Sequence, residues 1–293
     1  MDDKNYLGLR IVGTIFLGFT LLEGVGLFCL VGLNDKDLVV NTINIDTESS
    51  SNLYNNKILQ LSDLHNHSLD YGNVNLLTKL NEIKASAAIK MIFITGDMVD
   101  NYTKENSFQN LEKLYQNLAG FNVPILFCSG NHEWYSAYQE KSFELMEKYG
   151  FHILDDMDSK YSPVFTYNNV NYISFRDPHY EDNNENYMSR HEGTVRERLN
   201  KTMKTITNDY PNVLLAHRPE LYHIYEEYNY SLIASGHTHG GIFDFNKIIV
   251  NNSSFIRGYY KKEKLYVNSG LGTTNFFNIR INVPAELTIF SFQ

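Results

Sequence analysis

Short apolar runs alternate with longer amphipathic stretches from residue 57 to residue 293. The apolar runs, which predict strands, are KILQLSD, MIFITGD, VPILFCSGN, VNYISFRD, NVLLAHR, SLIASGH, KLYVNSG and AELTIFSF. The stretches with helical spacing cover 73–87, 105–119, 138–149, 193–208 and 219–228. Because strands this apolar are buried on both faces, the pattern predicts an α/β fold in which helices cover a sheet.

The N-terminal region contains one long apolar run, residues 11–33, with the sequence IVGTIFLGFTLLEGVGLFCLVGL and a single charge at Glu23. A helix of this length spans about 35 Å at about 1.5 Å per residue, which is enough to cross the hydrocarbon core of a bilayer. We therefore expect residues 1–33 to be a membrane anchor. A cleaved signal peptide, a lipid-modified Cys29 and a buried soluble helix are alternatives, and the role of Glu23 stays open.

The charges that flank this run predict its orientation. Lys4, Arg10 and the terminal amine precede the run, whereas only Lys36 follows it closely. Because positive residues favour the cytoplasmic side, this bias places the N-terminus inside and the main domain outside. The sequence thus predicts a single-pass protein of the cell membrane with an extracytoplasmic main domain.

Residues 34–56 lie between the apolar run and the alternating pattern. They hold a strand-like piece, DLVVNTINI, followed by the polar segment DTESSSNLYNN. Because small polar residues favour turns and connections, we interpret 34–56 as a linker with a short strand. The main domain is then predicted to cover residues 57–293.

The overall charge narrows the classes of partner. The chain carries a formal net charge of −9, and its pI is about 5.6. A general nucleic-acid-binding protein normally presents a basic surface to the phosphates, so no nucleic-acid binding is expected. Cys29 and Cys128 both lie within apolar runs, which indicates small buried residues rather than a disulfide pair.

Most of the predicted strands end in residues of the kinds that bind metal ions. The candidates are Asp63, His65, Asp97, Asp100, Asn131, His132, His217, His237 and His239. In open α/β sheets, ligands bind beyond the carboxyl ends of the strands, so we expect these residues to form one site. On an extended backbone, residues i and i+2 point to the same face, which would make Asp63 and His65 a chelating pair. Taken singly, each motif is equally consistent with a surface turn or, for Asp97, with a helix N-cap.

The mixture of carboxylate, imidazole and amide groups indicates which ions would bind. Such ligands suit borderline to hard divalent ions such as Mn²⁺, Fe²⁺ or Zn²⁺. Seven candidate ligands remain when Asp100 and His132 are set aside, and seven are too many for one ion. The sequence therefore predicts two divalent metal ions.

The order and spacing of these motifs resemble the signature of the calcineurin-like metallophosphoesterases. The series is Asp63-x-His65, Gly96-Asp97-x-x-Asp100, Gly130-Asn131-His132-Glu133, His217 and Gly236-His237-x-His239. The segments LAHRPE, GHTHGG, GYYKKEKLYVNSGLGTT and NIRINVPAELTIF further resemble the bacterial membrane-associated branch, which includes enzymes that cleave the pyrophosphate of UDP-diacylglucosamine. The resemblance implies a four-layer α/β/β/α sandwich.

The resemblance also implies a role for each candidate. Asp63, His65 and His239 would hold one ion, Asn131, His217 and His237 would hold the other, and Asp97 would bridge them. A hydroxide shared by the two ions would attack phosphorus in line. His132 would stabilise or protonate the leaving oxygen, and Asp100 would pair with His132 to orient it.

One departure from the family pattern bears on the substrate. Protein-phosphatase members carry an arginine after Gly-Asp-x-x-Asp, whereas Asn101 follows Asp100 here. This favours a phosphodiester or pyrophosphate substrate, which could be lipid-linked or a nucleotide. A non-catalytic metal-binding scaffold of the same fold and an amidohydrolase that uses His65 and His67 are the alternatives. The role of His67 stays open, and Arg218 could form either a salt bridge or a phosphate contact.

Overall fold

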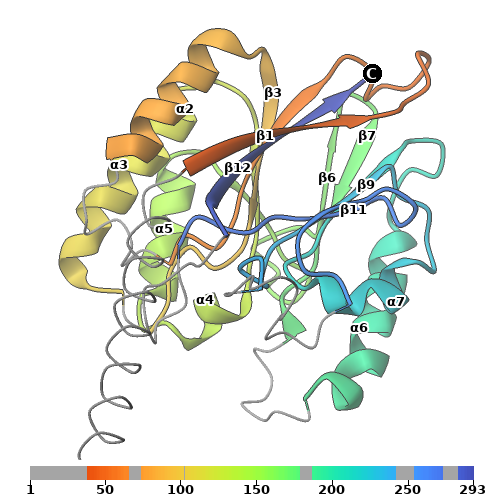
Figure 1. The fold of residues 1–293 in the computed structure, drawn as a ribbon. Coiled ribbons are helices and arrows are strands. Elements are labelled where there is room, and N and C mark those ends of the chain that lie inside the picture. The colour runs from red at the N-terminus through yellow and green to blue at the C-terminus, as the bar shows by residue number, and fades with distance from the viewer. Residues whose placement is uncertain (1–37, 66–73, 102, 179–186, 242–253, 273–282) are drawn as a thin grey trace, which may run out of the picture.

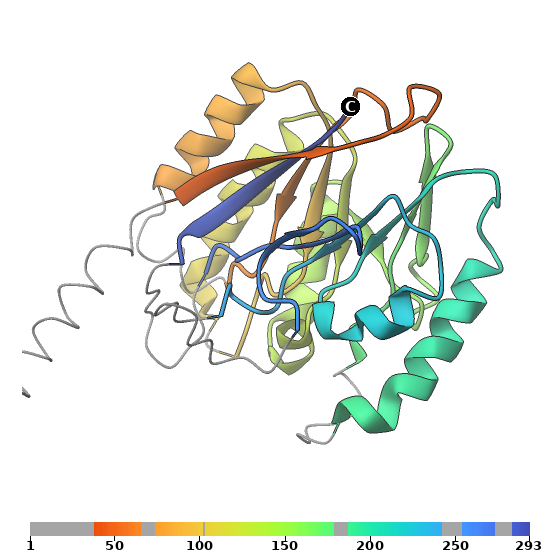
Figure 2. The same ribbon diagram turned by 45° about the vertical axis from the view of Figure 1, so that its right-hand side comes forward.

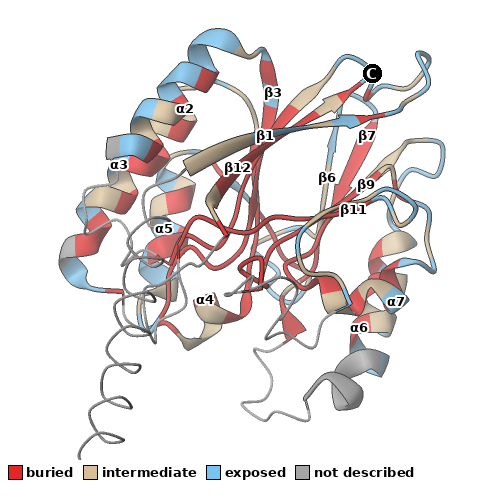
Figure 3. Ribbon diagram, in the orientation of Figure 1, coloured by how far each residue is buried: buried red, intermediate tan, exposed pale blue. Residues whose placement is uncertain are grey.

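Two six-stranded β-sheets form the middle of the molecule in the computed structural model, which describes residues 38–65, 74–101, 103–178, 187–241, 254–272 and 283–293 (Figure 1). Apolar side chains from both sheets fill the space between them, with Phe93, Tyr266 and Phe290 among the largest. The inner strands of each sheet are buried along most of their length, whereas β1, β6 and β10 and the outer sides of the helices are partly exposed (Figure 3). The predicted α/β fold is thus confirmed, and its sheets are mixed.

The first sheet has the strand order β1-β12-β2-β3-β4-β5. Its strands are β1 (Leu38–Ile45), β2 (Lys57–Leu61), β3 (Ile89–Thr95), β4 (Ile125–Cys128), β5 (His152–Leu154) and β12 (Ala285–Phe292). β2 to β5 run parallel to one another, and β12 runs antiparallel to β2. The carboxyl ends of β2, β3 and β4 therefore lie at one edge of this sheet.

The second sheet has the order β10-β11-β9-β8-β7-β6. Its strands are β6 (Val164–Tyr167), β7 (Val170–Ile173), β8 (Asn212–Leu215), β9 (Leu232–Ser235), β10 (Gly258–Tyr260) and β11 (Leu265–Val267). β7, β8, β9 and β11 are parallel, and antiparallel β6 and β10 close the two sides. The carboxyl ends of β8 and β9 consequently lie next to each other.

Helices cover the outer face of each sheet and complete four layers (Figures 1 and 2). The first sheet is covered by α2 (Val74–Ser86), α3 (Phe108–Ala119) and α5 (Gln139–Lys148), and the second by α6 (Tyr187–Met203) and α7 (Tyr222–Tyr225). The short elements η2 (Glu105–Ser107), α4 (Asn131–Tyr135) and η4 (Pro219–Leu221) lie in connections. In α3, the buried residues Phe108, Leu111, Leu114, Tyr115 and Leu118 recur at helical spacing, which explains why this stretch packs on the sheet as a helix.

The segment 34–56, which the sequence predicts to be a linker, is built into the sandwich where it is described. β1 pairs in parallel with β12 through all eight of its residues, from Leu38 beside Ala285 to Ile45 beside Phe292. Leu53, in the polar part of the segment, is fully buried in the core between the sheets. The short strand expected in this segment is present as β1, and its neighbour in the sheet, β12, comes from the far end of the sequence.

The predicted localisation also needs correction. Across the described part of the chain, no helix has the length and apolar character needed to cross a membrane. The apolar run 11–33, on which the expected membrane contact depended, lies outside the described residues. The expectation of a single-pass cell-membrane protein with an extracytoplasmic domain therefore does not stand.

Candidate metal centre

Loops that follow five strands bring the predicted residues together where the ends of the two sheets meet. Asp63 and His65 follow β2, Asp97 and Asp100 follow β3, Asn131 and His132 follow β4, His217 follows β8, and His237 and His239 follow β9. Three overlapping groups have ligand atoms within 4.8 Å of one another, namely Asp63–His65–His239, His65–Asp97–His132 and Asp97–His217–His237. The expectation of one convergent site therefore matches the placement of these side chains.

Five of the site residues have a left-handed rather than an extended backbone. Asp63, His65, Asp97, His237 and His239 all have positive φ, between 46° and 72°. A side chain with a Cβ pays about 1–2 kcal/mol for this conformation, so the surrounding structure must hold it. Backbone hydrogen bonds do so, since the Asp63 and His65 amides donate to the carbonyls of Gly96 and Asp97. The convergence of Asp63 with His65 thus comes from a turn, and the extended-strand explanation is wrong.

The first group places two imidazoles against a carboxylate. Nε2 of His65 lies 3.1 Å from Nε2 of His239, which in turn lies 3.7 Å from Oδ1 of Asp63. The other ring nitrogen of His65, Nδ1, lies 3.3 Å from Oδ2 of Asp100. A carboxylate in that position fixes a ligand imidazole with its inner nitrogen facing the site. The sequence paired Asp100 with His132, whereas the structure places its carboxylate against His65.

Asp97 lies between the two ends of the site. Its Oδ2 is 3.1 Å from Nε2 of His217 and 3.9 Å from Nε2 of His65. Its Oδ1 accepts a hydrogen bond of 2.8 Å from the amide of His132. Burial raises the pKa of Asp97, but the charges of His217, His132 and His65 and a hydrogen bond from His217 together outweigh burial and hold the pKa well below its usual range. This carboxylate is therefore ionised and within reach of both groups.

His217 and His237 face each other on the second sheet. Nδ1 of His217 lies 2.8 Å from the carbonyl oxygen of Thr95, so Nδ1 carries the proton and Nε2 faces the site. Nε2 of His217 lies 3.2 Å from Nδ1 of His237. Burial lowers the pKa of His217, yet the charge and hydrogen bond of Asp97, together with the charges of Asp63 and Asp177, outweigh burial and raise the pKa to about 10. The buried carboxylates thus stabilise a positive charge at the position of His217.

Asn131 and His132 begin α4, immediately beyond β4. Oδ1 of Asn131 and Nδ1 of His132 are buried, and neither has a hydrogen-bond partner among the described residues. The ring of His132 stands edge-on to that of His65, with centroids 4.7 Å apart, and burial lowers its pKa. A buried amide oxygen without a donor is costly unless a cation or a donor meets it. The orphaned Asn131 oxygen and the facing imidazole nitrogens fit a site for divalent cations.

Glu133 is a residue whose part in the site the sequence reasoning did not foresee. Its fully buried carboxylate accepts backbone N–H groups from Asp97, Met98 and Gly130, at 2.9, 2.6 and 2.7 Å. Burial raises its pKa to about 7. Glu133 therefore ties the loop after β3 to the loop after β4. The signal available in the sequence was an acid that directly follows Asn131-His132 at a strand end.

Two positions in the site are glycine because a side chain there would collide with neighbouring residues. A Cβ on Gly130 would lie 2.8 Å from both Cγ and the amide nitrogen of Asp97, and closer still to its Oδ1. A Cβ on Gly236 would collide with the carboxylate of Asp63 and the hydroxyl of Ser62. Both glycines lie just before a candidate ligand pair, so close backbone approach explains them better than turn geometry.

Three further sequence expectations concern Arg218, His67 and Cys128. Arg218 is buried and its Nε lies 2.9 Å from Oδ2 of Asp177, which favours the salt-bridge interpretation. His67 lies outside the described residues. Cys128 is a buried free thiol, as predicted.

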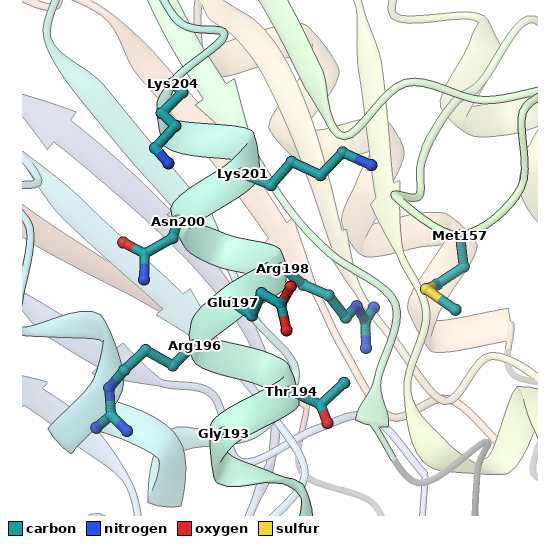
Figure 4. A pocket seen from close by; sticks show the side chains of 9 residues that line it. All are labelled: Met157, Gly193, Thr194, Arg196, Glu197, Arg198, Asn200, Lys201 and Lys204. Atoms are coloured by element: carbon teal, nitrogen blue, oxygen red, sulfur yellow. The ribbon is translucent and has the colours of Figure 1, made fainter.

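A large surface groove lies apart from the metal centre, along the outer face of α6 (Figure 4). It measures about 860 Å³ and is lined mainly by basic and polar side chains together with Met157. Two of its cations are already paired, Arg196 with Glu227 and Arg198 with Asp156. None of the predicted site residues lines this groove, so it offers no reaction centre.

The fold and the site define a class before any comparison is made. Two mixed sheets pack face to face, and carboxylates and imidazoles from both sheets form a candidate metal centre at one edge, as in a metallophosphoesterase. The sequence profile of the calcineurin-like phosphoesterases matches residues 56–241, and the chain belongs to this family. The predicted family is thus confirmed. The amidohydrolase alternative is wrong, because that class requires a barrel rather than two packed sheets.

Relatives of known sequence support the same family. An uncharacterised metallophosphoesterase of Campylobacter jejuni is 26% identical over 81% of this chain, which spans 59% of that relative's length. The uncharacterised metallophosphoesterase YkoQ of Bacillus subtilis is 26% identical over 94% of this chain and 98% of its own. The UDP-2,3-diacylglucosamine pyrophosphatase LpxG of Chlamydia muridarum is 25% identical over 82% of this chain and 84% of its own.

Among solved structures, sulfate thiohydrolase SoxB from Thermus thermophilus covers 82% of this chain and 56% of its own, with 14% identity and a TM-score of 0.46.

Proposed function

We propose that this chain is a dinuclear metal-dependent phosphoesterase that hydrolyses phosphodiester or pyrophosphate bonds. The observation that carries the proposal is the pair of ligand groups Asp63–His65–His239 and Asp97–His217–His237, with Asp97 of the second group 3.9 Å from His65 of the first. Asn131, with its orphaned buried oxygen, would complete the second group. Both groups contain ionisable ligands suited to Mn²⁺, Fe²⁺ or Zn²⁺.

The cation ligands, Asp97 and Asp100 would each have a separate role in hydrolysis. Divalent cations held by the two groups would supply an acidified water and would neutralise charge on the phosphoryl oxygens. Asp97 would contact both, since its Oδ2 faces His217 and His65. Asp100 would keep His65 oriented through Nδ1.

His132 is the group best placed to act on the leaving oxygen. Its ring lies beside His65, and its Nδ1 has no other hydrogen-bond partner among the residues described. Because burial lowers the pKa of His132, its imidazole is neutral at neutral pH and can donate a hydrogen bond without adding charge to the site. We assign it to stabilisation of the leaving oxygen through this hydrogen bond.

The charges around the site favour a substrate with little charge on each phosphorus. Asn101, not an arginine, follows Asp100, and Arg218 is engaged by Asp177 and Glu220. A dianionic phosphomonoester would therefore lack the clamp that protein phosphatases provide. The likeness to LpxG, named a UDP-2,3-diacylglucosamine pyrophosphatase, supports a pyrophosphate substrate with a lipid-linked or nucleotide group.

The test is hydrolysis of bis-p-nitrophenyl phosphate by the full chain after chelation and reloading with Mn²⁺, Zn²⁺ or Mg²⁺. We expect at least one ion to restore turnover, and we expect His132→Ala to lower kcat by about 10²–10⁴-fold. His152→Ala changes an exposed histidine at the start of β5 and serves as the matched control. Binding of metal without any turnover would point to the non-catalytic scaffold, and no binding would refute the proposal.

Substrate choice needs a second comparison. The kcat/KM values for p-nitrophenyl phosphate, a nucleotide diester and a UDP-linked acylated sugar should be measured on the same reloaded protein. A higher kcat/KM for the monoester than for the diester and the pyrophosphate would contradict the proposed substrate class.

A further inference from the structure

The outer ring nitrogen of His237 meets two charged side chains that lie outside both ligand groups. Nε2 of His237 is 3.0 Å from Nη1 of Arg218 and 3.4 Å from Oε1 of Glu220. Its inner nitrogen, Nδ1, faces His217 across 3.2 Å. The orientation of this imidazole is therefore set from its outer side.

The chemistry of the two neighbours decides which of them suits a metal-binding imidazole. A guanidinium only donates hydrogen bonds, so Arg218 requires Nε2 to be an acceptor and places the ring proton on Nδ1. A neutral imidazole that offers Nδ1 to a cation carries its proton on Nε2 instead. That N–H needs an acceptor, and Oε1 of Glu220 is the carboxylate oxygen beside it. Cation binding and the Arg218 contact thus demand opposite tautomers, whereas Glu220 suits the metal-binding one.

Glu220 is held ready for this role by a buried chain of ion pairs. Its Oε1 lies 3.0 Å from Nη1 of Arg218, and Arg218 Nε lies 2.9 and 3.2 Å from the two oxygens of Asp177. The hydroxyl of Tyr225 donates to the Arg218 carbonyl at 2.9 Å. Oε2 of Glu220 is buried and lacks a hydrogen-bond partner in the described part of the chain. The carboxylate is therefore fixed at the ring and has acceptor capacity to spare.

We propose that Glu220 is a positioning residue, which accepts the Nε2–H of His237 and thereby fixes Nδ1 toward the second cation. Arg218 is not a metal ligand in this arrangement. Asp177 fixes Arg218, and Arg218 in turn fixes Glu220. The proposal rests on the proposed function, because it needs a cation between His237 and His217. A carboxylate behind a ligand histidine typically raises metal affinity by about 10–100-fold.

The experiment is a Mn²⁺ titration of the metal-free full chain, followed by calorimetry and by the electron paramagnetic resonance signal of coupled Mn²⁺ pairs. We expect Glu220→Ala to weaken the second ion by about 10–100-fold and to leave the first ion within about twofold of wild type. Glu220→Gln keeps an acceptor oxygen without the charge, so it should restore part of the lost affinity. Glu226→Gln, which neutralises an exposed carboxylate directly after α7, is the matched control.

The outcomes separate the two proposals. If wild type binds fewer than two Mn²⁺, the proposed function fails and takes this inference with it. If wild type binds two and both Glu220 variants bind the second as tightly, only this inference is overturned. Equal weakening of both ions would indicate general loosening of the fold and would also overturn it. If Glu220→Ala does not fold, as judged by its thermal transition, the Glu220→Gln titration decides by the same criterion.

Discussion

Substituting Gly130 by alanine should displace the Asp97 carboxylate without straining the backbone. Gly130 has φ −96° and ψ −172°, an extended conformation that alanine adopts freely. The added Cβ would lie 2.8 Å from Cγ of Asp97, whereas ordinary contact begins at 3.4 Å. Because the Cβ would lie equally close to the Asp97 amide nitrogen, either Asp97 with its backbone or the start of α4 must move by at least 0.6 Å, the difference between 3.4 and 2.8 Å.

The loss of stability and turnover in Gly130→Ala can be estimated because the displaced residue, Asp97, lies in the metal centre. Overpacking of this kind costs about 1–3 kcal/mol of stability. Asp97 belongs to two of the three ligand groups, and displacements near 1 Å at a reaction centre cost about 100-fold. We expect Gly130→Ala to lower kcat/KM on bis-p-nitrophenyl phosphate by about 10–100-fold and to weaken both Mn²⁺ ions.

The control for this prediction is Gly193→Ala, in α6, where a Cβ would meet nothing within 4 Å. It should leave metal binding unchanged and stabilise the helix by about 0.5–1 kcal/mol. Calorimetry with Mn²⁺, steady-state turnover and urea unfolding would be measured on both variants. Turnover and affinity within twofold of wild type in a normally folded Gly130→Ala protein would refute the steric reasoning.

Three further predictions concern metal binding and the loops around it. His239→Ala should weaken the ion held with Asp63, and His237→Ala the ion held with Asn131; calorimetry that shows the same ion lost in both would contradict the two-group assignment. Removal of metal with a chelator should lower the melting temperature, and Mn²⁺ at about 100 times its Kd should return about 2.7 kcal/mol; an unchanged melting temperature on reloading would argue against binding to the folded state. Glu133→Ala should cost at least about 3 kcal/mol in urea unfolding, because three buried N–H groups lose their acceptor at about 1 kcal/mol each; a loss under about 1 kcal/mol would show that water replaces the carboxylate.

The strand ends were predictable because their signal is local. The runs before Asp63, Asp97 and His217 are apolar enough to be read as buried strands, and the polar residues that follow them are read from the same few positions. Parallel pairing then brings their carboxyl ends together, and the structure places the expected ligands within reach of one another. Most of the candidate site could thus be predicted without knowledge of tertiary contacts.

What the sequence did not reveal depends on partners distant in the chain. The left-handed conformation of His65 is held by the carbonyl of Asp97, and β1 finds its place through β12. The contact of Asp100 with His65 could not be predicted, because spacing along the chain does not rank the histidines that lie near Asp100 in space. The role proposed for Glu220 likewise depends on its contacts with Arg218 and His237, which form only in the folded structure.

Each of the two proposed ion sites, Asp63–His65–His239 and Asp97–His217–His237, takes ligands from both sheets. Asp63, His65 and Asp97 come from the first sheet, and the histidines at 217, 237 and 239 come from the second. Neither sheet alone carries all the ligands of either proposed ion, so binding of both cations during refolding has to wait for the sheets to dock. In a stopped-flow experiment, secondary structure should therefore recover first, and a metal-binding signal would mark the last step, the closing of the sandwich.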